Sequence, residues 1–253
     1  MSEQPLSVTA AVLVIGDEIL SGRTKDKNIG FIADYMTNIG IDLCEVRIVP
    51  DVEDEIVAAV NALRLRYTYV FTTGGIGPTH DDITADAVAR AFGVGIAEDL
   101  RAIELLLEII KPENLNEARR RMARIPHGAE LVQNRISKAP GFWIGNVIVM
   151  AGVPSVMQVM LEDLAPKLVT GARTVSETIE AGNVPEGAYA AELSAVASAY
   201  PHLSIGSYPA YVDGKFHNQI VVRGKQQGEV SGAVLAIRIF LDRLTAERVK
   251  SVP

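Results

Sequence analysis

The sequence has very little cysteine and no long apolar run, and both absences narrow the classes of protein to which it can belong. Its 253 residues include a single cysteine, Cys44, which excludes an intramolecular disulfide and a zinc site built from several cysteines. The apolar runs fall far short of the roughly 20 residues that a membrane helix needs. The opening residues carry no basic region followed by an apolar stretch, as a signal peptide would. We therefore expect a cytoplasmic protein that does not insert into a membrane.

Positive charge is also scarce. Lysine and arginine total 24 against 31 acidic residues, which gives a net charge of −7 and a pI of about 5.2. Phosphate backbones are bound by basic faces, so nucleic acid is not an expected partner. A small phosphorylated ligand needs only a local positive potential or a metal ion, and that class of partner stays open. The overall composition is that of a globular protein, with 48% hydrophobic and 22% charged residues.

Apolar patterning alternates between strand and helix from Val8 to Leu168. Such alternation predicts an α/β fold with a mostly parallel sheet and right-handed crossovers. The expected strands are Ala10–Ile15, Ile41–Val49, Tyr67–Thr73, Glu130–Gln133 and Asn146–Met150. The expected helices are Lys27–Ile39, Glu53–Leu65, Ile83–Phe92, Ala102–Ile110, Leu115–Ile125 and Pro154–Leu168, with a turn at Lys138–Phe142.

The order of elements changes after about residue 170. We expect a strand, a helix, two strands and a helix, which is typical of a small α+β domain. Asp213-Gly214 between the two adjacent strands is a strong hairpin signal. The sequence therefore predicts two domains, residues 1–170 and residues 171–253.

The segment Thr72–Thr84 combines a strand end, a glycine-rich loop and a helix expected to begin near Asp82. In open parallel sheets, ligands bind beyond the carboxyl ends of the strands. Glycines let the backbone approach an anion, and a helix start offers free N–H groups to a phosphate. The loop is neither a Walker A motif nor a dinucleotide fingerprint, which would have a third glycine where His80 stands. A tight strand-to-helix turn needs glycine in any case, so a structural role and phosphate binding both stay open.

Acidic residues accompany this loop and the two preceding strand ends. Asp82 has capping-box spacing from Thr79 and could instead hold a hard cation such as Mg²⁺. Asp51 follows the second strand, where it could cap a helix or bind the same cation. Gly16-Asp17-Glu18 follows the first strand. Acids beside a phosphate repel it unless a cation bridges them, so the three loops together predict a metal–phosphate site.

Four motifs in order identify a family resemblance. They are Gly16-Asp17-Glu18-Ile19-Leu20-Ser21-Gly22, Thr73-Gly74-Gly75-Ile76-Gly77-Pro78-Thr79 with Asp81-Asp82-Ile83-Thr84, Ala139-Pro140-Gly141-Phe142, and Gly152-Val153-Pro154-Ser155. Together they resemble the molybdopterin-binding domain of molybdenum-cofactor biosynthesis proteins, in the form that opens the competence/damage-inducible (CinA) proteins. Ala151 and Val156 stand where that family often has proline and glutamate.

The resemblance implies a three-layer α/β/α domain, followed by a small α+β domain, with a pocket for a pterin or nucleotide phosphate. It further implies cleavage of a nucleotide pyrophosphate of the ADP-ribose type, dependent on Mg²⁺ or another divalent cation. The alternatives are molybdopterin binding or adenylyl transfer, and a binding module without catalysis. A homo-oligomer is expected. The C-terminal deamidase domain of full-length CinA proteins is not present in these 253 residues, so deamidation is not expected.

The resemblance also assigns roles to residues. Asp51 and Asp82 are the predicted catalytic and metal-binding groups. The predicted phosphate or nucleotide contacts are Gly16, Asp17, Glu18, Ser21, Thr73, Gly74, Gly75, Gly77, Pro78, Thr79, Pro140 and Gly141. Basic side chains outside the motifs have two interpretations each: Lys138 and the group Arg119, Arg120, Arg121 and Arg124 could grip a phosphate or lie on a solvated face.

Overall fold

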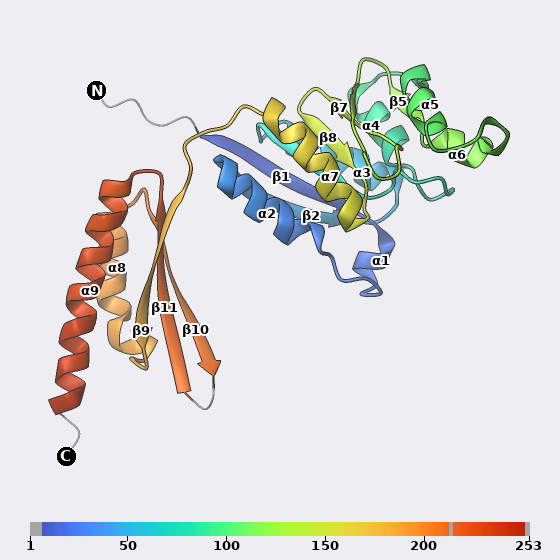
Figure 1. The fold of residues 1–253 in the computed structure, drawn as a ribbon. Helices are drawn as coiled ribbons and strands as arrows, with labels where there is room; N and C mark the ends of the chain where they lie inside the picture. The colour runs from blue at the N-terminus through green and yellow to red at the C-terminus, as the bar shows by residue number, and fades with distance from the viewer. Residues whose placement is uncertain (1–6, 213–214, 251–253) are drawn as a thin grey trace, which may run out of the picture. The chain divides into compact units, whose positions relative to one another are not determined.

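The structure is a computed structural model that describes residues 7–212 and 215–250 (Figure 1). The chain divides into two compact units, one from Leu6 to Gly171 and one that begins at Ala172. The sequence placed this boundary after residue 170. Each unit is described by itself below. Within the described residues, no helix is both long and apolar enough to cross a bilayer.

The first unit is a mostly parallel six-stranded sheet with the strand order β2-β1-β3-β8-β7-β6. Strand β1 pairs in parallel with β2 and β3, and β3 pairs in parallel with β8, while β7 and β6 add an antiparallel edge. The strands of the unit are β1 Val8–Ile15, β2 Ile41–Val49, β3 Tyr69–Thr73, β4 Ile96–Glu98, β5 Arg124–Pro126, β6 Glu130–Val132, β7 Gly141–Ile144 and β8 Val147–Met150. The helices are α1 Asp17–Leu20, α2 Asn28–Ile39, α3 Glu53–Arg64, α4 Thr84–Phe92, α5 Leu100–Leu107, α6 Glu117–Arg121 and α7 Pro154–Leu164, with 3₁₀ turns at Pro112–Asn114 and Ala165–Lys167.

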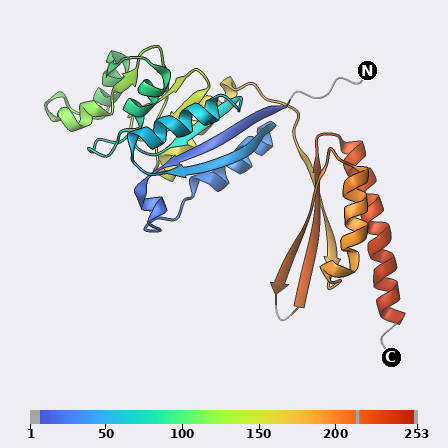
Figure 2. The ribbon, with the colours of Figure 1, turned by 180° about the vertical axis from the view of Figure 1, so that it is seen from behind.

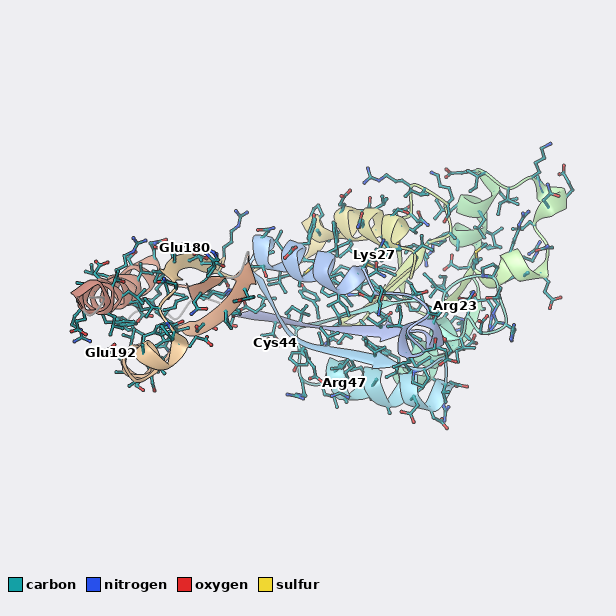
Figure 3. The ribbon with its side chains drawn as sticks, turned by 90° about the horizontal axis from the view of Figure 1, so that it is seen from below. Arg23, Lys27, Cys44, Arg47, Glu180 and Glu192 are labelled. Carbon is teal, nitrogen blue, oxygen red and sulfur yellow. The ribbon has the colours of Figure 1, made fainter. Side chains whose placement is uncertain are left out.

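Helices cover both faces of this sheet, which confirms the three-layer prediction. Helices α2 and α7 pack on one face, where they bury Ile32, Met36 and Met160 against the even-numbered residues of β1. Helices α3 and α4 pack on the other face against the odd-numbered residues of β1. Figure 2 brings α3 to the front, and Figure 3 shows the sheet edge-on between the two helical layers. Because both faces are covered, β1 is apolar along nearly its whole length, as a central parallel strand must be.

Several parts of this unit differ from the prediction. Helix α1 and strand β4 were not expected, and two further differences concern strands β7 and β5. Gly141–Ile144, within and just after the expected turn, forms strand β7, because Phe142 and Trp143 pair with β8 across the tight turn at Gly145. The helix expected over Leu115–Ile125 is limited to α6, and Arg124–Pro126 becomes strand β5, which pairs with β4. A helix cannot continue through Pro126, because proline lacks the backbone N–H that a helix needs. Ile125 is instead buried in the core of this unit.

The second unit is a three-stranded antiparallel sheet covered by two helices. Its elements are β9 Val175–Gly182, α8 Glu186–Ala199, β10 Ser204–Val212, β11 Lys215–Gly224 and α9 Gln227–Lys250, with the strand order β10-β11-β9. Tyr189 and Phe240 stack at the centre of its core, with Ile220 and Ile237 around them. The predicted β-α-β-β-α order is confirmed. The turn residues Asp213-Gly214 lie outside the described residues, and the β10–β11 ladder reaches Val212 and Lys215.

Candidate functional site

The carboxyl ends of β1, β2, β3 and β8 meet at one edge of the parallel sheet. The backbone N–H of Gly16, after β1, donates to Val49 O at the end of β2 at 3.2 Å. The N–H of Gly74, after β3, donates to Met150 O at the end of β8, also at 3.2 Å. The loops that carry the predicted motifs are thus fastened together, at the edge where ligands bind in open α/β sheets.

Glycine is required in these loops by packing. Gly74 has a φ of 103°, and a Cβ there would lie 2.1 Å from Ile15 O. Gly75 has a φ of 66°, and its Cβ would lie 2.2 Å from Thr84 Oγ1. A Cβ on Gly152 would lie 3.2 Å from the Gly74 backbone. The structural role left open by the sequence is therefore real for Gly74 and Gly75, and it does not exclude a ligand on the outer side of the loop.

The helix after the loop begins at Thr84, one residue after the predicted range Ile83–Phe92. Thr84 donates from its N–H to Gly75 O and from Oγ1 to Gly74 O, both at 3.0 Å, so its amide is occupied by the loop. The Asp82 carboxylate accepts from Thr79 N at 2.8 Å and from Thr79 Oγ1 at 2.6 Å. This pair closes the loop upon itself before the helix begins. The capping-box prediction is therefore wrong: Thr79 and Asp82 do bond to each other, but their bond lies ahead of the helix and does not cap it.

A hollow of about 60 Å³, which we call the strand-end hollow, lies where β1, β3 and the start of α2 meet. Thr73 and Asn28 line it, and both are almost fully buried, with 1% and 4% of their surface exposed. Asn28 Nδ2 donates to Gly152 O at 2.8 Å. Among residues 7–212 and 215–250, Asn28 Oδ1 and Thr73 Oγ1 have no hydrogen-bond partner. Buried polar atoms are nearly always paired with protein or with water, so these two oxygen atoms are positioned to accept a polar partner in the hollow, either water or a ligand.

Charged side chains from two loops also line the strand-end hollow. Lys25 and Lys27, from the segment before α2, supply positive charge, and Glu18 supplies negative charge. Figure 3 labels Lys27 beside the start of α2. Asp26, between the two lysines, accepts from Asn28 N and Ile29 N and so caps the helix. This cap holds the segment in place and leaves the lysines as the positive groups of the hollow.

Sequence reasoning missed the contribution of residues 24–28 and of Gly152 to this hollow. A usable signal was present: Asn28 is a polar residue that opens the apolar stripe of α2. Of the predicted contacts, Thr73, Gly74 and Glu18 line the hollow. Ser21 is exposed, and its hydroxyl donates to Glu18 O at 3.3 Å.

Asp51 lies between two acidic loops. Its Oδ2 accepts a hydrogen bond of 2.9 Å from Asp17 N, and Val52, not Asp51, is the N-cap of α3. Burial raises the pKa of Asp51, and the charges of Asp17, Glu18 and Asp81 raise it further against the lowering effect of the Asp17 hydrogen bond. An excess of negative charge around a carboxylate is the condition that a cation relieves.

Asp51 could hold a magnesium ion only together with waters and the phosphates of a bound substrate. Within the described chain, no group of three or more histidine, cysteine or acidic residues is arranged to hold a metal. Mg²⁺ is ordinarily bound by one or two carboxylates together with waters and substrate phosphates, so it does not need such a group. Asp51 offers one carboxylate with one oxygen committed to Asp17 N.

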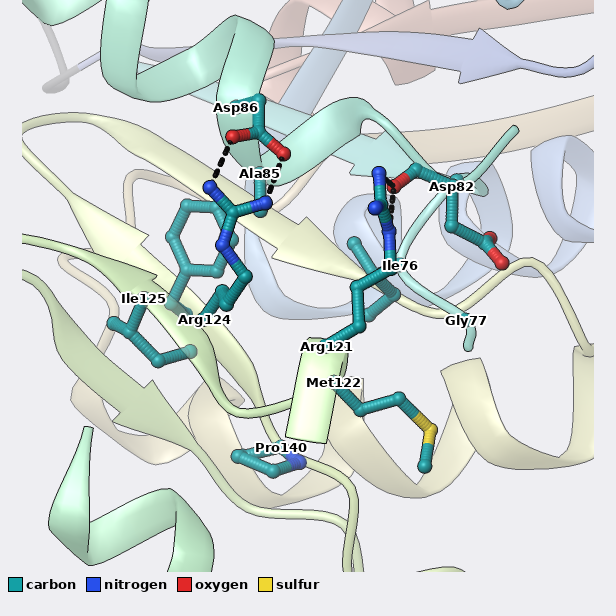
Figure 4. A pocket seen from close by; sticks show the side chains of 12 residues that line it. Ile76, Gly77, Asp82, Ala85, Asp86, Arg121, Met122, Arg124, Ile125 and Pro140 are labelled. Carbon is teal, nitrogen blue, oxygen red and sulfur yellow. Dashed lines mark hydrogen bonds and ion pairs between the residues drawn. The ribbon is translucent and has the colours of Figure 1, made fainter. Parts of the chain in front are cut away.

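Asp82 faces a different cavity from Thr73 and Gly74. Asp82, Gly77 and Pro140 line a hollow of about 20 Å³ between the glycine loop and α6, shown in Figure 4. This volume holds about one water molecule. Gly141 has a packing role, because its Cβ would lie 2.1 Å from Val149 O. The structure thus distributes the predicted residues over both sides of the loop.

Lys138 is engaged elsewhere. Its Nζ forms an ion pair of 2.5 Å with Glu108. The backbone at Lys138 has a φ of 58°, in the left-handed region. Of its two interpretations, the ion pair supports the one in which Lys138 is a surface residue.

Comparison with known proteins finds family matches for both units. Residues 11–170 match the family described as a probable molybdopterin binding domain, and residues 173–249 match the middle domain of FAD synthase. A protein of Archaeoglobus fulgidus is 33% identical over 207 residues, which is 81% of this chain and 88% of that protein. A protein of Saccharolobus islandicus is 35% identical over 191 residues, 72% of this chain and 73% of that protein.

A solved structure supports the same conclusion for the first unit. The structure described as the protein CinA with unknown function from Thermoplasma acidophilum is 30% identical, with a TM-score of 0.61. The match covers 64% of this chain and 99% of that one. The family and fold inferred from the four motifs are therefore confirmed, and the chain belongs to the molybdopterin-binding domain family, in its CinA-like form.

Proposed function

We propose that the strand-end hollow binds the phosphorylated part of a nucleotide or pterin, and that the protein cleaves a nucleotide pyrophosphate of the ADP-ribose type. The observation that carries the binding proposal is the pair of buried, unpartnered oxygen atoms, Asn28 Oδ1 and Thr73 Oγ1. A buried polar atom without a partner costs about 1–3 kcal/mol, and a ligand that bonds to it recovers that free energy.

The chemistry of these two atoms describes the ligand. The Thr73 hydroxyl can donate to a phosphate oxygen, whereas Asn28 Oδ1 can only accept, from a hydroxyl or N–H of the ligand. Lys25 and Lys27 add positive charge on the same hollow. A ligand that carries a phosphate next to a hydroxyl or an N–H group, such as a sugar phosphate or a pterin phosphate, meets all three demands.

The proposed reaction is hydrolysis. Water attacks one phosphorus atom, the bond from that phosphorus to the bridging oxygen breaks, and two monophosphates leave with the protons of the water. A divalent cation held by Asp51 would neutralise phosphate charge and lower the pKa of a bound water. The chain itself would bind one phosphate through Thr73, orient the adjoining group through Asn28, and keep the loop rigid through Thr84.

Molybdopterin binding without hydrolysis is the second candidate. It is favoured by the match of residues 11–170 to a family described as probable molybdopterin binding. The pyrophosphatase proposal is favoured by the second unit, which matches the middle domain of a nucleotide enzyme, FAD synthase.

A turnover assay separates the two candidates. The purified protein with Mg²⁺, Mn²⁺ or Co²⁺ should convert ADP-ribose into AMP and ribose 5-phosphate, and Asp51→Asn should reduce the rate at least about a hundredfold because it removes the metal-binding charge. The absence of turnover on ADP-ribose, FAD and NAD with all three metals would refute the hydrolase. Measurable molybdopterin affinity in that case would support the second candidate.

A matched pair of variants tests the hollow. Thr72 and Thr73 are neighbours in β3, both are buried, and both have an unpartnered Oγ1, but only Thr73 lines the hollow. Thr73→Val should weaken the binding of ribose 5-phosphate about tenfold, which corresponds to about 1.4 kcal/mol, without loss of stability. Thr72→Val should leave the affinity unchanged. Equal affinities for both variants and the wild type would show that the hollow does not bind the phosphate.

A further inference from the structure

Four arginines lie near the glycine loop, on α6 and at the start of β5, and they differ in their hydrogen-bond partners. We call Arg119, Arg120, Arg121 and Arg124 the arginine cluster. Arg120 and Arg124 have carboxylate partners, whereas Arg119 and Arg121 bond to backbone carbonyls. The partners are Asn114 O for Arg119 at 2.7 Å, Glu98 for Arg120 at 2.8 Å, Asp82 O for Arg121 at 3.2 and 3.3 Å, and Asp86 for Arg124 at 2.6 and 2.8 Å.

Arg121 is a half-buried cation without a paired carboxylate among the residues that the structure describes. Its Nε and Nη2 donate to a single acceptor, Asp82 O, as the dashed lines in Figure 4 show. A guanidinium has five N–H donors, so the Nη1 group and one Nη2 hydrogen remain for another acceptor. The pKa of Asp81 is lowered mainly by a hydrogen bond from Thr79, and the charge of Arg121 adds a smaller lowering effect.

Arg121 also lines a second, larger cavity at the tip of the glycine loop. This loop-tip hollow has a volume of about 530 Å³ and is open to solvent on one side. Ligand sites of small molecules occupy about 300–1,000 Å³, so its size suits a nucleoside. The loop that separates it from the strand-end hollow is short: Gly74 lines one and Pro78 lines the other. Four residues span at most about 14 Å, so one extended ligand could reach both hollows.

The groups around the loop-tip hollow are those that recognise a nucleoside phosphate. His80 presents an exposed imidazole on which a base can stack. Glu98 and Glu117 offer carboxylate oxygens that can accept from ribose hydroxyls. Arg121 offers a planar guanidinium that suits a phosphate. Each group alone is an ordinary surface residue, but all four line one hollow directly beside the phosphate loop.

We propose that the loop-tip hollow is the nucleoside subsite of the ligand and that Arg121 holds the phosphate attached to that nucleoside. This inference rests on the proposed function, in which the other phosphate lies in the strand-end hollow. It assigns the specificity for a nucleotide to the loop tip and to Arg121. Arg124 also lines the loop-tip hollow, but its guanidinium is held by Asp86 in a bidentate ion pair, so the ligand contact is assigned to Arg121.

Calorimetric titration without divalent metal tests the inference, because it measures binding alone, without the metal-dependent hydrolysis. The probes are ADP, pyrophosphate and ribose 5-phosphate. Arg121→Gln should weaken ADP binding about 10–100-fold, since a hydrogen bond to a charged group contributes about 1.5–3 kcal/mol. Ribose 5-phosphate needs only the strand-end hollow, so its affinity should not change. Pyrophosphate lacks the nucleoside and should bind wild-type protein at least about tenfold more weakly than ADP.

Arg119→Gln is the matched control, because Arg119 lies on the same helix, also bonds to a backbone carbonyl and lines none of the hollows described above. It should change the ADP affinity less than about twofold. Arg121→Lys keeps the charge and should recover part of the ADP affinity that Arg121→Gln loses.

The outcomes separate the two proposals. Unchanged ADP affinity in Arg121→Gln would overturn the inference and leave the proposed function standing. Equal losses for ADP and ribose 5-phosphate would also overturn it, because they would show that Arg121 only supports the loop through Asp82 O. Wild-type protein that binds none of the three probes, either without metal or in a repeat titration with Mg²⁺, would refute the proposed function itself.

Discussion

The backbone N–H of Asp17 donates a 2.9 Å hydrogen bond to the carboxylate of Asp51. The two residues are 34 positions apart and follow different strands, so this bond joins the first two loops of the sheet edge. It also brings two carboxylates close to each other, and the Asp17 charge is one cause of the raised pKa of Asp51. The arrangement is electrostatically unfavourable in the protein alone, and the proposed cation would relieve it.

Asp51→Asn should therefore stabilise the protein while it abolishes metal-dependent activity. The folded-state pKa of Asp51 is raised, so folding favours its protonated form. That contribution is present below the ordinary value of 3.8 and is lost as the pH rises through the folded-state pKa. At pH 7.5 the ionised group opposes folding, so the amide should raise the Tm. The increase should be small because solvent screens this partly exposed group, and it should shrink toward pH 4.

Thermal melts of both proteins at several pH values measure this difference. Asp34→Asn, an equal change of charge at an exposed position of α2, should shift the Tm by less than about 1 °C. A lower Tm for Asp51→Asn at pH 7.5 would contradict the raised pKa.

Gly74→Ala should destabilise the protein far more than Gly22→Ala. Both glycines have positive φ, 103° and 73°, so both substitutions meet the backbone penalty of about 1–2 kcal/mol. A Cβ on Gly74 would lie 2.1 Å from Ile15 O, whereas nothing lies within 4 Å of a Cβ on Gly22. Urea denaturation should show a difference of at least about 2 kcal/mol between the variants. Similar midpoints would mean that the loop can move away from β1 without penalty.

Thr84→Val should cost about 1–3 kcal/mol, because it leaves Gly74 O without the Oγ1 donor in a buried setting. Thr84→Ser keeps the hydroxyl and should cost about 1 kcal/mol, from the lost methyl group. The free energies of unfolding from urea titrations give both values. If Thr84→Ser were the more damaging change, packing rather than the hydrogen bond would hold the loop.

The ion pair between Arg124 and Asp86 should contribute modestly to stability. Two bonds of 2.6 and 2.8 Å make it bidentate, but about a third of each side chain is exposed, so solvent screens it. A double-mutant cycle with Arg124→Gln and Asp86→Asn should give a coupling of about 0.5–1.5 kcal/mol at low salt and less at 1 M salt. A coupling near zero at low salt would show that the pair does not fix β5 to α4.

The sequence was sufficient for the longer strands of the first unit. Strand β2 matches its predicted range, Ile41–Val49, because Gly40 ends the preceding helix in a left-handed conformation and a β-rich run follows. Strand β7 was not predicted, because Gly141–Ile144 is short and its pairing with β8 depends on a tight turn. A four-residue strand has too little periodicity to be distinguished from a loop.

The candidate site, likewise, was predicted from the sequence only in part. The four motifs at the strand ends were sufficient for the family, and the parallel order of the strands placed their loops at one edge. The sequence could not show that Asn28 shares a hollow with Thr73, because the two residues are 45 positions apart and neither matches a ligand motif. Nor could it show which arginines of the cluster have a carboxylate partner, because Glu98 and Asp86 reach Arg120 and Arg124 from other elements.

By itself, the sequence determined the α/β architecture, the second small domain and the glycine-rich loop, because apolar periodicity, glycine positions and motif order are local properties of the chain. Only the tertiary structure decided that Gly74 and Gly75 are required by packing, that Asp82 bonds to Thr79 ahead of the helix, and that the loop divides two hollows. Those facts depend on distances between segments far apart in the chain, which burial and hydrogen bonding set only when the whole sheet edge has assembled.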